Sequence, residues 1–294
     1  MQNRFLGGIA IKVNISDDFV ARLEDFNFNI KKAASLFSGD LSGVMKGGRT
    51  EFAGHKPYSP GDDFRYIDWN AASRSDSLHS KTFFAESTSK IHIWIDTSAS
   101  MFVKLDEAFK IGISLAFLAL KADAETSLSF YIDSITLQYL GAYKNQASIF
   151  EIIGLINSLE FSEYEGLHFP VDRILKSHGR NSQIIVISDA YDDELLQTVK
   201  ALSQRNMLVL LLQTLSQDEL TPKYFENMLL QDSETKEMLK IPGNSSVHDN
   251  YINELDKHIV KIKGFCRQHH IAYKLCNTNL PINELLIKHI LSTQ

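Results

Sequence analysis

The sequence is poor in cysteine and lacks the long apolar run of a membrane-spanning segment. Its two cysteines, Cys266 and Cys276, have no framework spacing, so we expect reduced thiols in a cytosolic protein. The longest apolar run covers residues 111–120, about half of the roughly 20 residues that a membrane span needs. The N-terminus reaches charged residues too early for a secretory signal. We therefore expect a cytoplasmic protein without a membrane span.

A basic excess is also absent, because the formal net charge is −6. This charge argues against a nucleic-acid-binding protein that relies on a general basic field. No period of 20–50 residues repeats, which argues against a solenoid or a propeller. With 44% hydrophobic and 22% charged residues, the composition is that of an ordinary soluble globular protein.

The chain changes character near residue 90. Strand and helix patterns alternate from there to residue 294, which predicts an α/β domain with a doubly wound, mostly parallel sheet. Residues 1–89 are expected to form a separate N-terminal segment packed on that domain. This segment has an amphipathic helical pattern over residues 17–45 and a part rich in Gly, Asp and Arg over residues 47–90. The expected strands are residues 91–95, 127–132, 135–140, 183–188, 207–213 and 271–276, and the main expected helices are residues 105–123, 146–158, 192–204, 248–269 and 282–292.

Oxygen-bearing side chains follow two of the expected strands. The run IHIWI ends in Asp96, and Ser98 and Ser100 come directly after it; the run QIIVIS ends in Asp189. If both strands are central and parallel, their carboxyl ends share one edge of the sheet, where such folds bind ligands. Carboxylate and hydroxyl oxygens suit Mg²⁺, which keeps several waters and leaves room for an external carboxylate. The alternative is that these residues only form a turn and cap the next helix.

A cluster of charged residues lies in the N-terminal segment, in the stretch SPGDDFRYIDWNAASR. Two interpretations remain open. The charges either fasten an irregular segment onto the neighbouring domain or form a docking face for a partner. The residues concerned are Asp62, Asp63, Arg65, Asp68 and Arg74.

Several of these motifs resemble known families. The loop from Asp96 to Ser100 resembles the first motif of the metal-ion-dependent adhesion site in von Willebrand factor A-like domains, and Asp189 stands where the third motif would be. More specifically, the chain resembles a bacterial family catalogued as domain of unknown function fifty-eight, from about residue 20 to the end. The matching elements are Glu51-Phe52, Tyr58 to Trp69, Ala72 to Arg74, Asp96 to Ser100, and the hairpin residues Asp232, Glu234 and Thr235.

The resemblance implies a von Willebrand factor A-like fold and a cation, Mg²⁺ or alternatively Mn²⁺, held by Asp96, Ser98, Ser100 and Asp189. It also implies a role as an adaptor or chaperone-like partner of a MoxR-type AAA+ ATPase, which is typically encoded nearby, with the cation binding an acidic group of the ATPase or of a client protein. One departure concerns the second motif. The family's threonine is missing from residues 166–169, and His168 is a poor ligand for a hard cation.

The sequence gives little support for an enzymatic function. A haloacid-dehalogenase-like phosphohydrolase needs a second acid two residues after its nucleophile, and that position is Ser98. The sequence has neither a Gly-x-Ser-x-Gly elbow nor a phosphate-binding Gly-x-x-x-x-Gly-Lys-Ser/Thr loop. We therefore expect a non-enzymatic interaction module. Its rival is a metal-independent scaffold in which the missing threonine marks a degenerate site.

Overall fold

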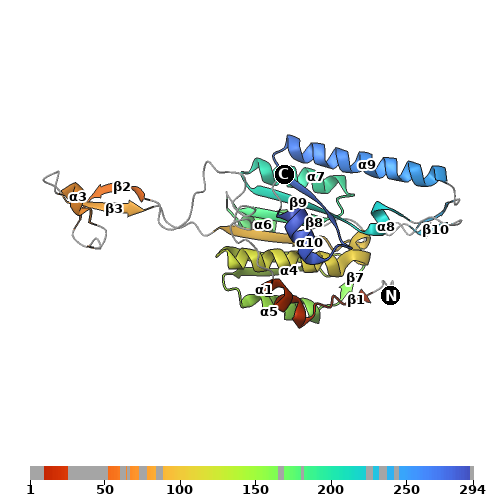
Figure 1. Ribbon diagram of the computed structural model, residues 1–294, viewed down its shortest axis with the longest axis horizontal. Coiled ribbons are helices and arrows are strands. Elements are labelled where there is room, and N and C mark those ends of the chain that lie inside the picture. The colour runs from red at the N-terminus through yellow and green to blue at the C-terminus, as the bar shows by residue number, and fades with distance from the viewer. Residues whose placement is uncertain are drawn as a thin grey trace, which may run out of the picture. The chain divides into compact units, whose positions relative to one another are not determined.

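The chain forms two compact units, residues 1–37 together with 89–294 and residues 38–88. The sequence predicts a domain boundary at residue 89, with all of residues 1–89 in the N-terminal segment. In the structure, the first 37 residues belong to the larger unit. The structure is a computed structural model (Figure 1). It describes residues 10–25, 52–59, 64, 67–72, 78–83, 89–164, 169–179, 182–222, 228–231, 237–241 and 245–291.

A six-stranded sheet forms the centre of the larger unit, in the order β12-β9-β8-β4-β5-β6. Every neighbouring pair is parallel except β5 and β6, which are antiparallel. The predicted α/β architecture with a mostly parallel sheet is therefore confirmed. The strands are β4 (Lys90–Ile95), β5 (Glu125–Tyr131), β6 (Leu137–Tyr143), β8 (Gln183–Ser188), β9 (Leu208–Leu215) and β12 (Ala272–Asn277).

The direction in which the chain adds strands reverses between β4 and β8. From β4 the chain proceeds to β5 and β6 on one side, and β8, β9 and β12 then extend the sheet on the other side. Open parallel sheets bind ligands outside the carboxyl ends of the strands at such a switch point. The ends of β4 and β8 are therefore the place to look for a site.

One face of the sheet packs against α4 (Leu105–Lys121), α5 (Ser148–Ser158) and the C-terminal helical segment. Ile91, Ile93 and Ile95 point from β4 into this core. The helix α4 lies close to the strand, because a Cβ added at Gly112 would stand 2.7 Å from Ile95 Cδ1. As its apolar sequence predicts, α4 is buried along most of its length.

The opposite face carries α6 (Val171–Ser177), α7 (Asp193–Gln204) and α9 (Ser245–Gln268). Trp94 of β4 points into this second core, as expected from the alternation of side chains along a strand. Both faces of β4 and β8 are covered, which explains why their sequences are continuous apolar runs.

The helix α1 (Asp17–Asp25) belongs to the larger unit. Its Phe19, Val20 and Leu23 are buried in the core that contains α4 and α5. Asn157 of α5 accepts a hydrogen bond from the Ile15 backbone N–H and donates one to the Ile15 carbonyl, both at 2.9 Å. Beyond residue 25, the predicted helix lies outside the described residues.

The smaller unit contains an antiparallel pair of strands that the sequence patterns did not predict. These are β2 (Phe52–Pro57) and β3 (His79–Phe83), and a short helix, α3 (Trp69–Ala72), lies between them in the chain. His55 Nε2 on β2 lies 2.8 Å from Asp68 Oδ2. The predicted packing of this segment on the α/β domain remains a prediction.

The remaining predicted elements of the larger unit form within a few residues of their expected positions. The hairpin that the family resemblance implies is present as β10 (Met228–Gln231) paired with β11 (Met238–Ile241), and its residues Asp232, Glu234 and Thr235 lie outside the described residues. The terminal helix begins as α10 (Ile282–Glu284) and continues as wider π-helical turns over Leu285–Ile290.

Candidate functional site

The two aspartates predicted to meet lie at the switch point of the sheet. Asp96 follows β4 and Asp189 follows β8, and these two strands are neighbours in register. Both residues are almost fully buried, with 1% and 2% of their surface exposed. Burying two carboxylates side by side is costly unless a positive charge or hydrogen bonds compensate them.

Hydrogen bonds hold Asp96 in place. Its Oδ1 accepts a hydrogen bond from the Ser98 backbone N–H at 2.9 Å, and its Oδ2 accepts one from the Ser188 hydroxyl at 2.6 Å. The hydroxyl oxygens of Ser98 and Ser100 lie 3.3 Å apart. The motif after β4 therefore brings a carboxylate and two hydroxyls into one short loop, which runs into the 3₁₀ helix η2 (Ala99–Lys104).

The electrostatic environment of Asp96 favours its neutral form. Burial, and then the negative charge of Asp189, raise the pKa of Asp96 to about 7, although hydrogen bonds from Ser188 and Ser98 act in the opposite direction. A cation beside Asp96 would relieve both unfavourable effects. Among the described residues, no basic side chain forms an ion pair with Asp96.

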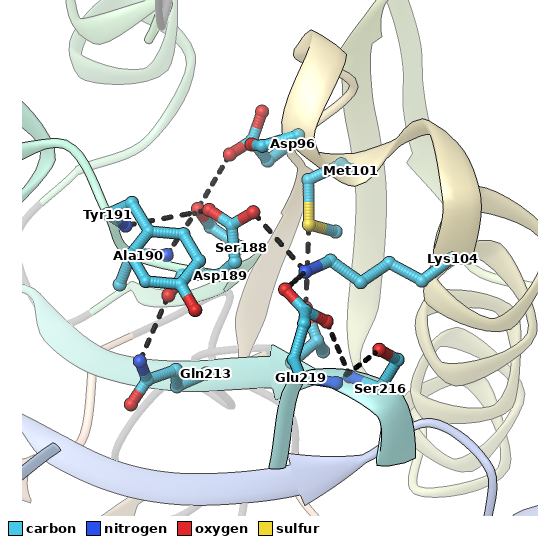
Figure 2. Close-up of polar contacts among 12 residues, drawn as sticks. Asp96, Met101, Lys104, Ser188, Asp189, Ala190, Tyr191, Gln213, Ser216 and Glu219 are labelled. Carbon is cyan, nitrogen blue, oxygen red and sulfur yellow. Dashed lines mark hydrogen bonds and ion pairs between the residues drawn. The ribbon is translucent and has the colours of Figure 1, made fainter. Parts of the chain in front are cut away.

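On the Asp189 side, the positive charge comes from a buried lysine. Lys104 Nζ lies 3.3 Å from Asp189 Oδ2 and 2.7 Å from Glu219 Oε1 (Figure 2). Asp189 Oδ2 is buried and has no hydrogen-bond partner of good geometry, so its contact with Lys104 is an ion pair only. Glu219, in contrast, accepts a hydrogen bond from Lys104.

Further contacts fix the two loops of the site. The Thr97 hydroxyl donates to the Tyr131 carbonyl at 2.7 Å and lies 3.0 Å from the Tyr164 hydroxyl. After Asp189, Ala190 adopts a left-handed conformation with φ of 59°, which costs a non-glycine residue about 1–2 kcal/mol. Strain of this kind, at the end of a central strand, is typical of functional loops.

The sequence predicted Asp96, Ser98, Ser100 and Asp189 as the site residues, but it gave no indication of Ser188 and Lys104, which contact the two aspartates, or of Glu219, which pairs with Lys104. Ser188 is the last residue of β8 and was treated only as part of the strand. Lys104 follows apolar residues in the stretch SMFVKL, and its sequence neighbours give no sign of its burial. Glu219 belongs to a Ser-x-x-Glu capping box that starts α8 (Gln217–Leu220), a recognisable signal for a helix start but not for an ion pair.

Two other predictions concern residues that are only partly described. In the region of the missing threonine, residues 165–168 lie outside the described residues, and Phe169 packs its ring 4.6 Å from that of Trp94. Of the predicted charge cluster, only Asp68 is described, and its partner is His55. The other members lie outside the described residues, namely Asp62, Asp63, Arg65 and Arg74.

A groove of about 1250 Å³ lies beside this site. Glu219, which pairs with Lys104, contributes to its lining, as do Val103 and Glu107 from the turn and helix after Ser100. Tyr251 also lines the groove, and its hydroxyl donates to the Glu219 carbonyl at 2.8 Å. The groove therefore shares one residue with the ion pair of the site.

The donor set can be tested against a divalent cation. Within the described residues, no three His, Cys, Asp or Glu side chains form a metal-binding group. A cation would thus depend on two carboxylates together with serine hydroxyls and water, a set that Mg²⁺ or Mn²⁺ accepts and a soft transition metal does not. The buried Asp189 Oδ2 without a hydrogen bond and the raised pKa of Asp96 fit this use.

Comparison with known proteins identifies the family. A family model described as "Protein of unknown function DUF58" matches residues 54–260, more than half of the chain. The chain belongs to the DUF58 family. No curated protein is similar enough to this DUF58 chain to match it. Among the described residues, no helix has the length and apolar character needed to cross a membrane.

Two crystal structures resemble the DUF58 chain remotely. One is titled conserved hypothetical protein BatB from Bacteroides thetaiotaomicron; it shares 12% identity at a TM-score of 0.38, covering 64% of this chain and 90% of that one. The other is titled an aerotolerance-related membrane protein from Bacteroides fragilis NCTC 9343 and shares 13% identity at a TM-score of 0.36, covering 63% and 90%. Likenesses this weak carry no argument about function.

Proposed function

We propose that this DUF58 chain is a non-enzymatic protein-interaction module with a von Willebrand factor A-like fold, and that it binds an acidic group of its partner through a divalent cation. The strand order, with its switch point between β4 and β8, supports the fold assignment. The Asp-x-Ser-x-Ser loop at the end of β4 supports the site.

The observation that carries the proposal is the electrostatic imbalance at the switch point. Asp96 and Asp189 are buried together, and Lys104 is held between Asp189 and Glu219 rather than beside Asp96. We assign Asp96, Ser98, Ser100 and Asp189 to the cation, Mg²⁺ or Mn²⁺. Bound there, the cation would supply a positively charged position for an incoming carboxylate. The protein's own contribution is to hold the Asp96 loop rigid through Ser188 and Thr97.

For the partner, we propose a MoxR-type AAA+ ATPase or a client protein that such an ATPase handles. The family resemblance of the motifs supports this choice. The groove next to the Lys104–Glu219 pair offers room for a segment of a partner chain around its acidic residue.

A metal-independent docking scaffold is the second candidate, and Lys104 is the observation that favours it. Its ammonium group already balances part of the buried negative charge without any metal ion. In that case the same face would bind its partner equally well with and without divalent cations.

Asp96→Asn tests the proposal, because it removes the charge while keeping an oxygen for the hydrogen bond from the Ser98 N–H. We expect the variant to fold and to lose at least about tenfold in affinity for a purified MoxR-type ATPase from the same genome, since a charge-assisted contact is worth about 1.5–3 kcal/mol. Surface plasmon resonance in buffer with millimolar Mg²⁺ or with EDTA provides the measurement.

Asp192→Asn is the matched control. Asp192 lies near the site in sequence but caps α7 through the Glu194 N–H, a role that asparagine also performs. The Asp192→Asn variant should bind the ATPase with the same affinity as the wild type. Equal binding by Asp96→Asn and wild type, in Mg²⁺ and in EDTA alike, would count against the cation and favour the metal-independent scaffold.

A further inference from the structure

Lys104 is a buried lysine at the edge of the candidate site. Only 1% of its side chain is exposed, although lysine is among the residues least often buried unless it is paired. It ends η2, the helical turn that begins directly after Ser98. Lys104 therefore belongs to the same short segment of the chain as Ser98 and Ser100, the two serines of the site.

The two carboxylates that contact Lys104 are held very differently. Glu219 is fixed on both sides: its Oε2 accepts from the Ser216 N–H at 2.7 Å, and its backbone N–H donates to the Ser216 hydroxyl at 3.2 Å. Its Oε1 accepts the Lys104 hydrogen bond at 2.7 Å. Glu219 is therefore a rigid anchor for the ammonium group.

Asp189 is the looser partner. Its Oδ2 stands 3.3 Å from Lys104 Nζ without a hydrogen bond of good geometry, and its Oδ1 accepts only a long contact of 3.5 Å from the Tyr191 N–H. Among the described residues, Lys104 is the only cation that forms an ion pair with Asp189. Its carboxylate is thus engaged by Lys104 through charge alone, which leaves its oxygens free to turn toward another cation.

We propose that Lys104 is an internal counter-cation that competes with a divalent cation for Asp189 and thereby sets the cation affinity of the site. The inference rests on the proposed function, since it concerns the same cation. A fixed ammonium group close to a shared carboxylate repels a divalent ion and already satisfies part of the negative charge that would attract it. Glu219 moderates this competition, because it holds the ammonium group and neutralises part of its charge.

Opposite effects on cation binding are therefore expected from the two partners. Lys104→Met keeps most of the length of the side chain but removes its charge, so this variant should bind Mg²⁺ at least about tenfold more tightly than the wild type. Glu219→Gln leaves the ammonium group balanced by Asp189 alone, so this variant should bind Mg²⁺ more weakly. Isothermal titration calorimetry with MgCl₂ measures both changes.

Lys110→Met is the matched control for the loss of a lysine charge. Lys110 lies on the same helical segment, one turn into α4, and pairs with Glu107 at the surface. Because exposed charges act weakly over distance, its Mg²⁺ affinity should stay within about twofold of the wild type. An affinity gain in Lys110→Met equal to that in Lys104→Met would overturn the specific role of Lys104.

The double variant Lys104→Met/Glu219→Gln removes both charges of the Lys104–Glu219 pair, so neither partner is left buried with an uncompensated charge. This variant is measured in place of Lys104→Met if the single variant does not fold. It should also bind Mg²⁺ more tightly than the wild type. If neither Lys104→Met nor the double variant folds, the Mg²⁺ affinity of Glu219→Gln decides the question. A Mg²⁺ affinity of Glu219→Gln that equals or exceeds that of the wild type overturns the inference.

The outcomes separate this inference from the proposed function. If the wild type and Lys104→Met bind Mg²⁺ with equal affinity, the counter-cation role of Lys104 is overturned, whereas the proposed cation site is supported. Binding by Lys104→Met but not by wild type supports the counter-cation role and contradicts cation-dependent function of the natural protein. The absence of binding in every variant overturns both.

Discussion

Replacing Phe109 with alanine should lower the free energy of unfolding by about 3–5 kcal/mol, the usual cost of removing a buried phenylalanine ring. Phe109 lies in α4, just after the turn that carries Ser100, and is fully buried. Its ring stands 4.9 Å from that of Phe130 and 5.2 Å from that of Phe161. The substitution removes these aromatic contacts and leaves a cavity between α4 and the sheet.

Denaturant unfolding measures this change as a lower midpoint with an unchanged slope. Phe150→Ala is the matched control, because Phe150 lies on α5 with 55% of its surface exposed. Its effect should stay within about 0.5 kcal/mol. A loss of less than about 1 kcal/mol in Phe109→Ala would mean that the three rings are not packed as described.

A second large effect should appear on acidification, and its cause is the buried residue His92 of β4. His92 is fully buried, and its two ring nitrogens each lie 2.8 Å from a serine hydroxyl, those of Ser127 and Ser129. Burial, and then the neighbouring His178, hold the pKa of His92 well below its ordinary value of 6.5. The folded protein therefore keeps this imidazole neutral in mild acid.

The sign of the effect follows from where the proton binds. Below pH 6.5 the unfolded chain protonates His92 more readily than the folded chain does, so His92 lowers stability as the pH falls, by at most about 1.4 kcal/mol per pH unit. Asp96, whose pKa is raised, acts in the opposite direction over part of this range. A comparison of wild type with His92→Gln isolates His92, because both proteins retain Asp96.

We expect His92→Gln to be less stable than wild type at pH 7, since glutamine cannot serve both serines. The difference in unfolding free energy between the two proteins should then narrow between pH 7 and pH 5, by at most about 2 kcal/mol. Chemical denaturation at a series of pH values provides the measurement. His289→Gln, at an exposed position near the C-terminus, should follow the wild-type profile. A gap between wild type and His92→Gln that stays constant with pH would contradict a buried neutral imidazole.

The central strands could be predicted because their environment leaves a strong mark on the sequence. Both faces of β4 and β8 are covered by helices, so each strand is a continuous apolar run. The aspartate that ends each run is conspicuous for the same reason, and parallel pairing then brings Asp96 and Asp189 to one edge. The prediction of the site rested on these two features.

The ion pair of the site could not be predicted, because it depends on residues far apart in the chain. Lys104 and Glu219 are separated by 115 positions, and only the folded sheet brings α8 next to η2. The paired strands β2 and β3 were missed for a different reason. Their sequences, FAGHKP and HSKTF, lack the regular alternation of apolar and polar residues that indicates a strand.

The membership of α1 in the larger unit also depends on tertiary contacts. Its amphipathic pattern predicted a helix with a buried face, but a periodic pattern does not say which partner covers that face. The structure supplies the partner, the core formed with α4 and α5.

Thermal unfolding with and without a divalent cation shows whether the folded protein binds a cation between Asp96 and Asp189. A cation bound only by the folded protein, at 100 times its Kd, adds about 2.7 kcal/mol to the free energy of unfolding. We expect Mg²⁺ to raise the Tm of the EDTA-treated wild-type protein, and we expect Asp96→Asn to abolish this rise. A wild-type Tm that is the same in EDTA, Mg²⁺ and Mn²⁺ would show that the folded protein binds no divalent cation at this site.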